Sequence, residues 1–554
     1  MLASNKCVPD YIFINLYYSD YTRLNINSRV YSSNMNREIL NAVKERGLLL
    51  EKEIYDLLNN LEDTKSVESF LELLEKLSGQ KIITRSVLSK NVEYARKVFA
   101  QPTEGALAAE KIFIKLGLNL EITKEKEILK KNDLATPRQS FQIFCADTRV
   151  EKKLEVSDFT NHLRARYHQI QRILMQRPGL SGLVSIGKIS SNRQTLNIIG
   201  AASEKRITKN KNLIVKFEDP TGAISAVFKQ DNKELYKKAN DLQLDDVVAV
   251  KASGNSDLLF AHDLFYPESF LTQKTRFKED ISIAFLSDIH AGGNRHLKKS
   301  IAKFLEWINS DNPDAKKIRY IFFVGDNVDG VGIFPNQEAS LELKNMSAQY
   351  SLLATYLNKI PKNITMFMCP GQHDAARVAE PQPIIDKKYA ASLYNIENLV
   401  LVTNPSLINL LEGSNEFKVL MYHGASIHTF INEIQDLRIS KAHRTPAKAV
   451  KEMLKRRHLA PTHSSVVYIP NAEKDPLVIS EVPDVLCTGE VHRLDIENYN
   501  STLIITGSCW QARTPHEERV GNIPDPAKVP VLNLKTHELK IFDFGDEEEI
   551  NREY

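Results

Sequence analysis

The sequence predicts a multidomain protein with a helical N-terminal domain, a small β-barrel and a C-terminal α/β domain that contains a two-layer sheet. The chain has 554 residues, enough for about three or four domains. The spacing of apolar residues is helical before residue 100, changes to short strands after residue 182, and changes again to buried strands after residue 280. Eleven of the 14 histidines also follow residue 280. Candidate metal chemistry is therefore expected in the last domain.

The overall composition is that of an ordinary globular protein. With 42% hydrophobic and 26% charged residues, the chain is neither wholly disordered nor a collagen or a coiled-coil rod. The net charge of +3 argues against a protein that wraps nucleic acid by charge alone. The longest apolar runs, such as Tyr320–Val324, are far shorter than the ~20 residues of a membrane span. We therefore expect no membrane association.

Cysteine usage and the first residues indicate a cytoplasmic protein. The five cysteines contain no C-x-x-C pair, so neither a disulfide framework nor a thiolate zinc site is expected. Asp10 and Asn15 interrupt the apolar core that a signal peptide would need.

The N-terminal quarter divides into three segments. Residues 1–34 are rich in Tyr, Asn and Ser without a period, and we expect a disordered extension or an ordinary frayed end. A strong helical period begins at Met35, which is a possible start of the protein, and predicts an all-helical domain over residues 35–100. Proline, glycine and a charged run predict a linker over residues 101–140.

Residues 141–275 predict a barrel preceded by a helix. Ser157 or Asp158 can cap the helix, which ends before Pro178. Its arginines, Arg166 among them, are expected on a solvated face rather than on DNA. The strand-like segments that follow are Leu183–Ile186, Leu213–Val215, Ala223–Phe228 and Val247–Val250. A five-stranded barrel of the OB type fits them. Because only Phe217 and Phe228 could stack on bases, protein docking is favoured over nucleic-acid binding.

In residues 276–554, five apolar strands are each followed by side chains that can bind metal. The strands are Ile281–Leu286, Tyr320–Val324, Thr365–Met368, Lys418–Met421 and Val485–Leu486. Ligands in α/β sheets bind outside the carboxyl ends of the strands. Residues distant in sequence are therefore expected to share one metal site.

The ordered motifs D-x-H, G-D-x-x-D-G, G-x-H-D, H-G and G-x-x-H resemble those of the calcineurin-like metallophosphoesterase superfamily. The stretches Gly325–Pro335, Arg457–Thr462 and Glu481–Asp484 are similar to the small subunits of archaeal D-family DNA polymerases. The resemblance implies a metallophosphoesterase domain beside an OB domain, and a heterodimer with a large catalytic subunit in DNA replication. It also implies a 3′–5′ exonuclease that proofreads single-stranded 3′ ends of DNA.

The resemblance also implies a set of site residues. One metal would be held by Asp288, His290, Asp326 and His492, and a second by Asp326, Gln372, His423 and Glu490. His373 would be the catalytic histidine, with Asp374 either as the residue that orients it or as a hydrogen-bonding partner behind the ligands. Mixed carboxylate and imidazole ligands suit two divalent ions, with Mn²⁺ favoured over Fe and Zn²⁺.

Two residues depart from the family pattern, and both belong to the second metal. Gln372 replaces the usual Asn, and Glu490 replaces the first His of G-H-x-H. The two changes either compensate each other or mark a weakened site. The alternatives are therefore an active exonuclease subunit and a structural subunit of the same polymerase. The order of the barrel and the α/β domain speaks against a third alternative, a free-standing phosphoesterase.

Several other residues have less specific interpretations. The basic stretch Lys441–Arg457 either contacts DNA phosphates or forms a solvated face. Trp510 is expected in the core beneath the site. A structural role is expected for the histidines that match no ligand position, which are His296, His428, His443, His458 and His463.

Overall fold

The computed structural model divides into two compact units, Met1–Ala135 and Thr136–Tyr554. The residues that it describes are 43, 46, 49–50, 82–83, 140–149, 153–268, 271 and 274–551. In the first unit, β1 (Leu49–Leu50) pairs in parallel with β2 (Ile82–Ile83). The expectation of an all-helical domain is therefore wrong at these four residues, because two-residue apolar pairs are too short to carry a period. Apart from residues 43 and 46, the rest of that domain, the extension 1–34 and the linker up to residue 139 lie outside the described residues.

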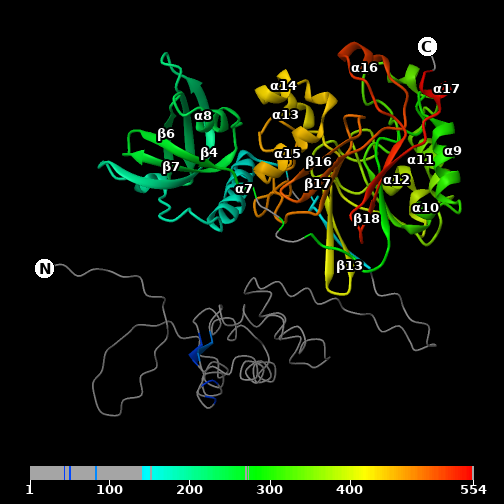
Figure 1. The fold of residues 1–554 in the computed structure, drawn as a ribbon, viewed down its shortest axis with the longest axis horizontal. Coiled ribbons are helices and arrows are strands. Elements are labelled where there is room, and N and C mark those ends of the chain that lie inside the picture. Colours follow the sequence, from blue (N-terminus) through cyan, green and yellow to red (C-terminus); the bar gives the residue numbers. More distant parts are fainter. Residues whose placement is uncertain are drawn as a thin grey trace. The chain divides into compact units, whose positions relative to one another are not determined.

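The second unit contains a closed five-stranded barrel, as predicted (Figure 1). Its strand order is β4-β5-β6-β8-β7, with α8 between β6 and β7 in the chain. The bounds are β4 Gln194–Ile207, β5 Leu213–Asp219, β6 Gly222–Phe228, α8 Lys233–Asn240, β7 Val247–Gly254 and β8 Leu259–Phe265. The rings of Phe217 and Phe228 are completely buried in the barrel core, so neither can stack on a base. The predicted strand Leu183–Ile186 is wrong, because Leu183 makes only one isolated bridge and Ile186 begins the 3₁₀ helix η1 (Ile186–Lys188).

The segment before the helix belongs to the α/β domain and not to the barrel. β3 (Phe141–Cys145) pairs antiparallel with β13 (Ser406–Glu412) at the edge of a sheet of that domain. The predicted boundary of the barrel domain at residue 141 is therefore wrong. Edge strands can come from any part of a chain, since their partner is set by long-range backbone pairing and not by local sequence.

The helix α7 spans Val156–Met175, and Glu155 is its N-cap residue. Asp158, predicted as a possible N-cap, is instead the third helical residue and completes a capping box with Glu155. The predicted solvated face is wrong for Arg166. Its guanidinium is 2% exposed and its Nε donates to Asp475 Oδ2 at 2.6 Å. This ion pair joins α7 to a loop of the α/β domain.

The α/β domain is a sandwich of two six-stranded sheets. The first sheet has the order β12-β11-β10-β9-β18-β19 and the second the order β16-β17-β15-β14-β13-β3. The strands of the first are β9 Ser282–Leu286, β10 Ile318–Val324, β11 Thr365–Cys369, β12 Leu399–Leu401, β18 Lys528–Asn533 and β19 Leu539–Asp543. The remaining strands of the second are β14 Asn415–Met421, β15 Val485–Thr488, β16 Asp495–Tyr499 and β17 Thr502–Thr506. All five strands predicted before metal-binding residues are confirmed, as β9, β10, β11, β14 and β15.

Three apolar layers hold this sandwich together. Phe285, Phe322 and Phe367 pack between the sheets against Val419 and Val485. Helices α9 and α11 cover the outer face of the first sheet, and α13 and α15 cover the second. The helices are α9 Lys298–Ile308, α10 Pro313–Lys317, α11 Met346–Leu357, α12 Lys387–Ala390, α13 Ile427–Glu433, α14 Gln435–Ile439, α15 Ala447–Arg456, α16 Pro515–Val520 and α17 Glu547–Ile550. Short 3₁₀ helices are η2 Gln337–Ser340, η3 Leu393–Asn395 and η4 Ala442–Arg444.

Among the described residues, no helix is both long and apolar enough to cross a membrane.

Candidate metal centre

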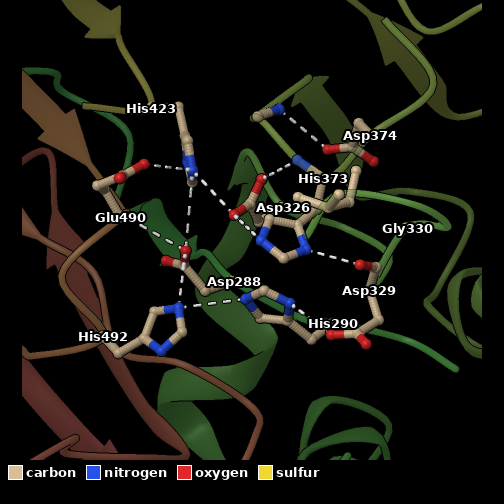
Figure 2. A network of polar contacts seen from close by, with 12 residues as sticks. Asp288, His290, Asp326, Asp329, Gly330, His373, Asp374, His423, Glu490 and His492 are labelled. Atoms are coloured by element: carbon tan, nitrogen blue, oxygen red, sulfur yellow. Dashed lines mark hydrogen bonds and ion pairs between the residues drawn. The ribbon is translucent and has the colours of Figure 1, made fainter. Parts of the chain in front are cut away.

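Five loops at the carboxyl ends of β9, β10, β11, β14 and β15 bring the predicted ligands together (Figure 2). The backbone is left-handed at five of these positions, with φ of +51° at Asp288, +47° at His290, +46° at Asp326, +72° at Glu490 and +58° at His492. Each such residue costs about 1–3 kcal/mol and persists only where the surroundings enforce it. Strain of this kind gathers at functional sites, which is where these residues lie.

The first group contains Asp288, His290 and His492, whose ligand atoms converge. The two histidine Nε2 atoms are 3.1 Å apart, and His492 Nε2 is 3.5 Å from Asp288 Oδ1. The other ring nitrogens face carboxylates, with His290 Nδ1 3.1 Å from Asp329 Oδ1 and His492 Nδ1 3.0 Å from Glu517 Oε1. When each Nδ1 donates its proton to a carboxylate, both Nε2 lone pairs face each other. A cation between them resolves this contact, so the donor set fits a metal ion.

The sequence patterns did not identify the orienting carboxylates. Asp329 lies in the G-D-x-x-D-G motif, but nothing in the motif separates an orienting residue from a ligand. Glu517 is found through its helix instead. It forms a capping box with Thr514 at the start of α16, and the spacing T-x-x-E is the available signal.

The second group contains Asp288, Asp326 and His423. His423 Nδ1 is fixed by the carbonyl of Val324 at 2.8 Å. His423 Nε2 then faces Asp326 Oδ2 and Glu490 Oε2, each at 3.3 Å. Buried atoms without a hydrogen-bond partner include His423 Nε2, Asp288 Oδ2 and Gln372 Oε1. Since buried polar atoms are normally paired, these atoms fit a second metal ion, with Gln372 and Glu490 both offering oxygen.

Charge in the second group is balanced between carboxylates and imidazoles. Burial lowers the pKa of His423, but Asp326, Glu490 and Asp288 outweigh burial and hold this pKa well above its ordinary value. Burial raises the pKa of Asp326, but His423 and His373 outweigh it and hold that pKa well below its ordinary value. The opposite shifts of these two pKa values favour a charged imidazole beside a charged carboxylate in the second group.

His373 lies at the edge of both groups, with its side chain 21% exposed. Its backbone N donates to Asp326 Oδ1 at 2.9 Å, and its Nδ1 donates to the carbonyl of Asp329 at 2.6 Å. This leaves Nε2 directed toward the site, 3.9 Å from Asp326 Oδ2. Burial lowers the pKa of His373, but Asp326 and Asp329 outweigh it and the pKa is raised.

Asp374 does not orient the His373 ring, so of its two expected roles the structure favours a hydrogen-bonding partner behind the ligands. Asp374 Oδ2 accepts hydrogen bonds from the backbone N of Asn327 at 3.1 Å and of Gly371 at 3.0 Å, and Oδ1 accepts from Tyr350 Oη at 2.9 Å. Asp374 therefore ties two ligand loops together, and the Asp329 carbonyl orients His373.

The site opens into a cleft of about 1770 Å³. The acidic lining residues Asp326, Asp329 and Glu517 are buried and Glu490 is half-buried, whereas the cationic lining residues are exposed except for the half-buried Arg295. The exposed cations are Lys441, Arg444 and Arg519. The cleft therefore has an acidic floor and a basic rim.

The remaining histidines divide into two kinds. His296, His458 and His463 make structural contacts, as expected, with Ile289 O, Asp475 and Tyr468 Oη respectively. His428 and His443 line the cleft instead. His428 Nε2 is 3.7 Å from Glu490 Oε1, and its ring lies 5.4 Å from that of His443.

Trp510 is buried in the core, as expected, and its backbone N donates to Asp288 O at 2.9 Å. The residues of the basic stretch Lys441–Arg457 differ in their position and burial. Lys441 and Arg444 line the cleft, while Arg456 and Arg457 are buried.

Comparison with known proteins agrees with this geometry. Residues 283–494 match the family model for the B subunits of DNA polymerases alpha and epsilon. The DNA polymerase II small subunit of Methanothermobacter thermautotrophicus is 31% identical over 92% of this chain and 100% of its own length. That of Pyrococcus horikoshii is 31% identical over 90% of this chain and 80% of its own. A solved archaeal phosphodiesterase is 14% identical over 47% of this chain and 99% of its own, but its TM-score of 0.24 is too low to support an argument.

Two mixed sheets with Asp, His and carboxamide side chains at their strand ends define an α/β protein with a candidate metal centre. Within that class, the chain belongs to the small subunits of archaeal DNA polymerase II, the D-family enzyme.

Proposed function

We propose that this subunit supports replication as a metal-dependent 3′–5′ exodeoxyribonuclease within a DNA polymerase heterodimer. The observation that carries the proposal is the convergence of metal-binding side chains from five loops on a cleft with a basic rim. Three of these side chains, Asp288, Gln372 and His423, have a buried atom without a hydrogen-bond partner. Asp288, His290, Asp326 and His492 would hold one divalent ion. Gln372, His423 and Glu490 would complete a second site with Asp326. Mn²⁺ suits these oxygen and nitrogen donors.

Two divalent ions would polarise the phosphodiester and lower the pKa of a bound water. The residues of the chain have complementary roles. Asp288 belongs to both groups, and Asp326, 3.3 Å from His423 Nε2, would serve both ions in this proposal. His373 Nδ1 donates to Asp329 O, so Nε2 carries a second proton only in the charged imidazolium. Burial lowers the pKa of His373, but Asp326 and Asp329 outweigh burial and raise this pKa, which favours the imidazolium. From the edge of the cleft it can give that proton to the departing 3′-oxygen of the penultimate nucleotide.

The barrel and the partner complete the proposal. The strand order β4-β5-β6-β8-β7, with α8 after the third strand, supports an OB domain. Since its phenylalanines are buried, the barrel is better suited to docking a protein than to stacking on bases. The related proteins are named small subunits, which supports a large catalytic partner for this chain.

A structural subunit without nuclease activity is the second candidate. The observation that favours it is confined to the second group, where Gln372 and Glu490 replace the family's Asn and His.

The experiment compares wild type with Asp326→Ala and with the control Asp311→Ala, whose side chain is 98% exposed. Metal content of the full chain is measured by mass spectrometry, and digestion of 5′-labelled single-stranded DNA is followed with Mn²⁺. We expect two ions per chain and digestion in wild type and control. Asp326→Ala should hold at most one ion and digest nothing, while it unfolds as cooperatively as wild type. A wild-type chain that digests no DNA at any Mn²⁺ concentration would leave the structural subunit.

A further inference from the structure

The loop after Gly330 exposes three apolar side chains beside the candidate metal centre. Val331, Ile333 and Phe334 are 38%, 39% and 46% exposed. Phe334 and Pro335 line the same cleft as Asp326 and His373. Single exposed apolar residues are ordinary, but a cluster of them in a cleft indicates a binding surface.

Two buried glutamines hold this loop in place. Gln349 Oε1 accepts from Gly330 N at 2.9 Å, and its Nε2 donates to Gly330 O at 3.0 Å. Gln337 Oε1 accepts from Ile333 N at 2.9 Å, and its Nε2 donates to Asp329 O at 2.8 Å. Both glutamines are at most 2% exposed. Because the backbone on either side of the apolar residues is fixed, their exposure is a property of the native fold.

The loop lies directly against His373. A Cβ placed on Gly330 would be 2.6 Å from His373 O and 2.7 Å from Ile333 Cγ1, so Ile333 folds back over Gly330 next to the His373 backbone. The Asp329 carbonyl, one residue earlier, accepts from His373 Nδ1 at 2.6 Å. Phe334 therefore belongs to the wall of the cleft that carries the proposed proton donor.

The remaining rim of the cleft is cationic, with exposed Lys441, Arg444 and Arg519. Proteins hold single-stranded nucleic acid by this combination, in which cations bind the backbone phosphates and an aromatic ring stacks on a base. In a duplex every internal base is stacked on both faces, whereas the bases of an unpaired strand can separate and offer their faces to an aromatic ring.

We infer that Phe334 is a base-stacking residue that binds an unpaired base near the 3′ end of DNA, while the cationic rim holds its phosphates. The inference rests on the proposed function of the site and adds to it the residue that recognises a base of the unpaired end.

The test is a double-mutant cycle that combines a substitution of Phe334 with removal of the bases at the 3′ end of the DNA. The probes are a 5′-fluorescein oligothymidylate and the same strand with abasic nucleotides at its 3′ end. The dissociation constants for the full chain are measured by fluorescence anisotropy with Ca²⁺. Wild type should bind the normal end about 10-fold more tightly than the abasic end. Phe334→Ala should bind both ends equally, and Phe334→Tyr should keep the preference. The matched control is Phe144→Ala, because Phe144 is 48% exposed on β3 and does not line the cleft.

A preference that survives in Phe334→Ala, or that is missing from wild type, would overturn the inference. Digestion is scored separately with Mn²⁺. Absence of digestion by wild type would overturn the exonuclease and leave the binding ratio to decide the role of Phe334.

Discussion

The carboxyl group of Glu380 should make the stability of this protein depend on pH. Glu380 is completely buried beside Tyr422, the residue before His423. Its Oε2 lies 3.2 Å from Tyr422 Oη, which lies 3.2 Å from Ser426 Oγ. Ser426 Oγ in turn donates to Leu459 O at 2.5 Å. The single proton of the Tyr422 hydroxyl can be donated to Glu380 or to Ser426 but not to both. Both hydrogen bonds form at once only when Glu380 is protonated and donates to Tyr422.

Burial raises the pKa of Glu380 from 4.5 to about 8. A carboxyl whose pKa is raised by folding stabilises the fold fully below its unfolded pKa, and this contribution is lost as the pH rises through the folded pKa. At about 1.4 kcal/mol per unit, the loss is roughly 5 kcal/mol over the whole range, and roughly 2–3 kcal/mol between about pH 6 and about pH 8.

Glu380→Gln replaces the titrating proton with a permanent amide donor to Tyr422. The assay is urea unfolding of EDTA-treated protein at about pH 6 and about pH 8. Wild type should lose roughly 2–3 kcal/mol more stability than Glu380→Gln across this interval. Glu416→Gln, an exposed residue on β14, should behave as wild type does. Equal pH dependence in wild type and Glu380→Gln would refute the assignment of a protonated carboxyl.

Three further predictions concern the site and its attachment to the barrel. If Gln372 and Glu490 compensate each other, the double variant Gln372→Asn with Glu490→His should digest DNA at a similar or lower rate than wild type. Each single variant should then digest DNA more slowly than the double variant. A double variant with higher activity and metal content than wild type would instead indicate a weakened native site. His373→Ala should keep both ions by mass spectrometry but digest about 10²–10⁴-fold more slowly, and loss of an ion would make it a ligand. Arg456→Met leaves Asp246 of the barrel buried without the partner that now lies at 3.0 Å. It should lower the free energy of unfolding by about 3–5 kcal/mol, and adding Asp246→Leu should restore most of this in urea titrations.

The strands of the α/β domain and their ligand loops could be predicted because the signal is local. An apolar run such as Tyr320–Val324 is long enough to identify a buried strand, and the polar residues directly after it must emerge at the sheet edge. The convergence of Asp288, Asp326 and His423 follows from that geometry alone. The distances between the individual ligand atoms could not be predicted in this way, because they depend on left-handed turns whose conformation the neighbouring loops enforce.

The features that were missed depend on contacts far apart in the sequence. β3 joins the α/β sheet through a partner some 260 residues later, Cys145 opposite Ser406, and its sequence reads equally well as a linker end. Arg166 is buried only because Asp475 meets it, and nothing within α7 distinguishes it from solvated arginines. β4 mixes polar and apolar residues over 14 positions, so its pattern has no clean period.

The two unusual residues of the second group, Gln372 and Glu490, still provide donor atoms for a metal ion, which a weakened site would lack. Loss of a metal site is simplest when a donor is replaced by an apolar or outward-facing side chain. Here both replacements still place an oxygen at the site. Glu490 Oε2 reaches His423 Nε2 at 3.3 Å, the same distance as Asp326 Oδ2. Gln372 Oε1 is buried without a hydrogen-bond partner, although a buried oxygen without a partner costs about 1–3 kcal/mol.

The backbone next to Gln372 and Glu490 also allows the loops to approach each other closely. A Cβ on Gly371 would overlap Asp326 Oδ1, and a Cβ on Gly489 would lie 2.5 Å from Asp288 Oδ2. A carboxylate in place of an imidazole adds negative charge, which favours a hard divalent ion electrostatically. The physical balance therefore favours a second site with altered donors over one that has lost its metal.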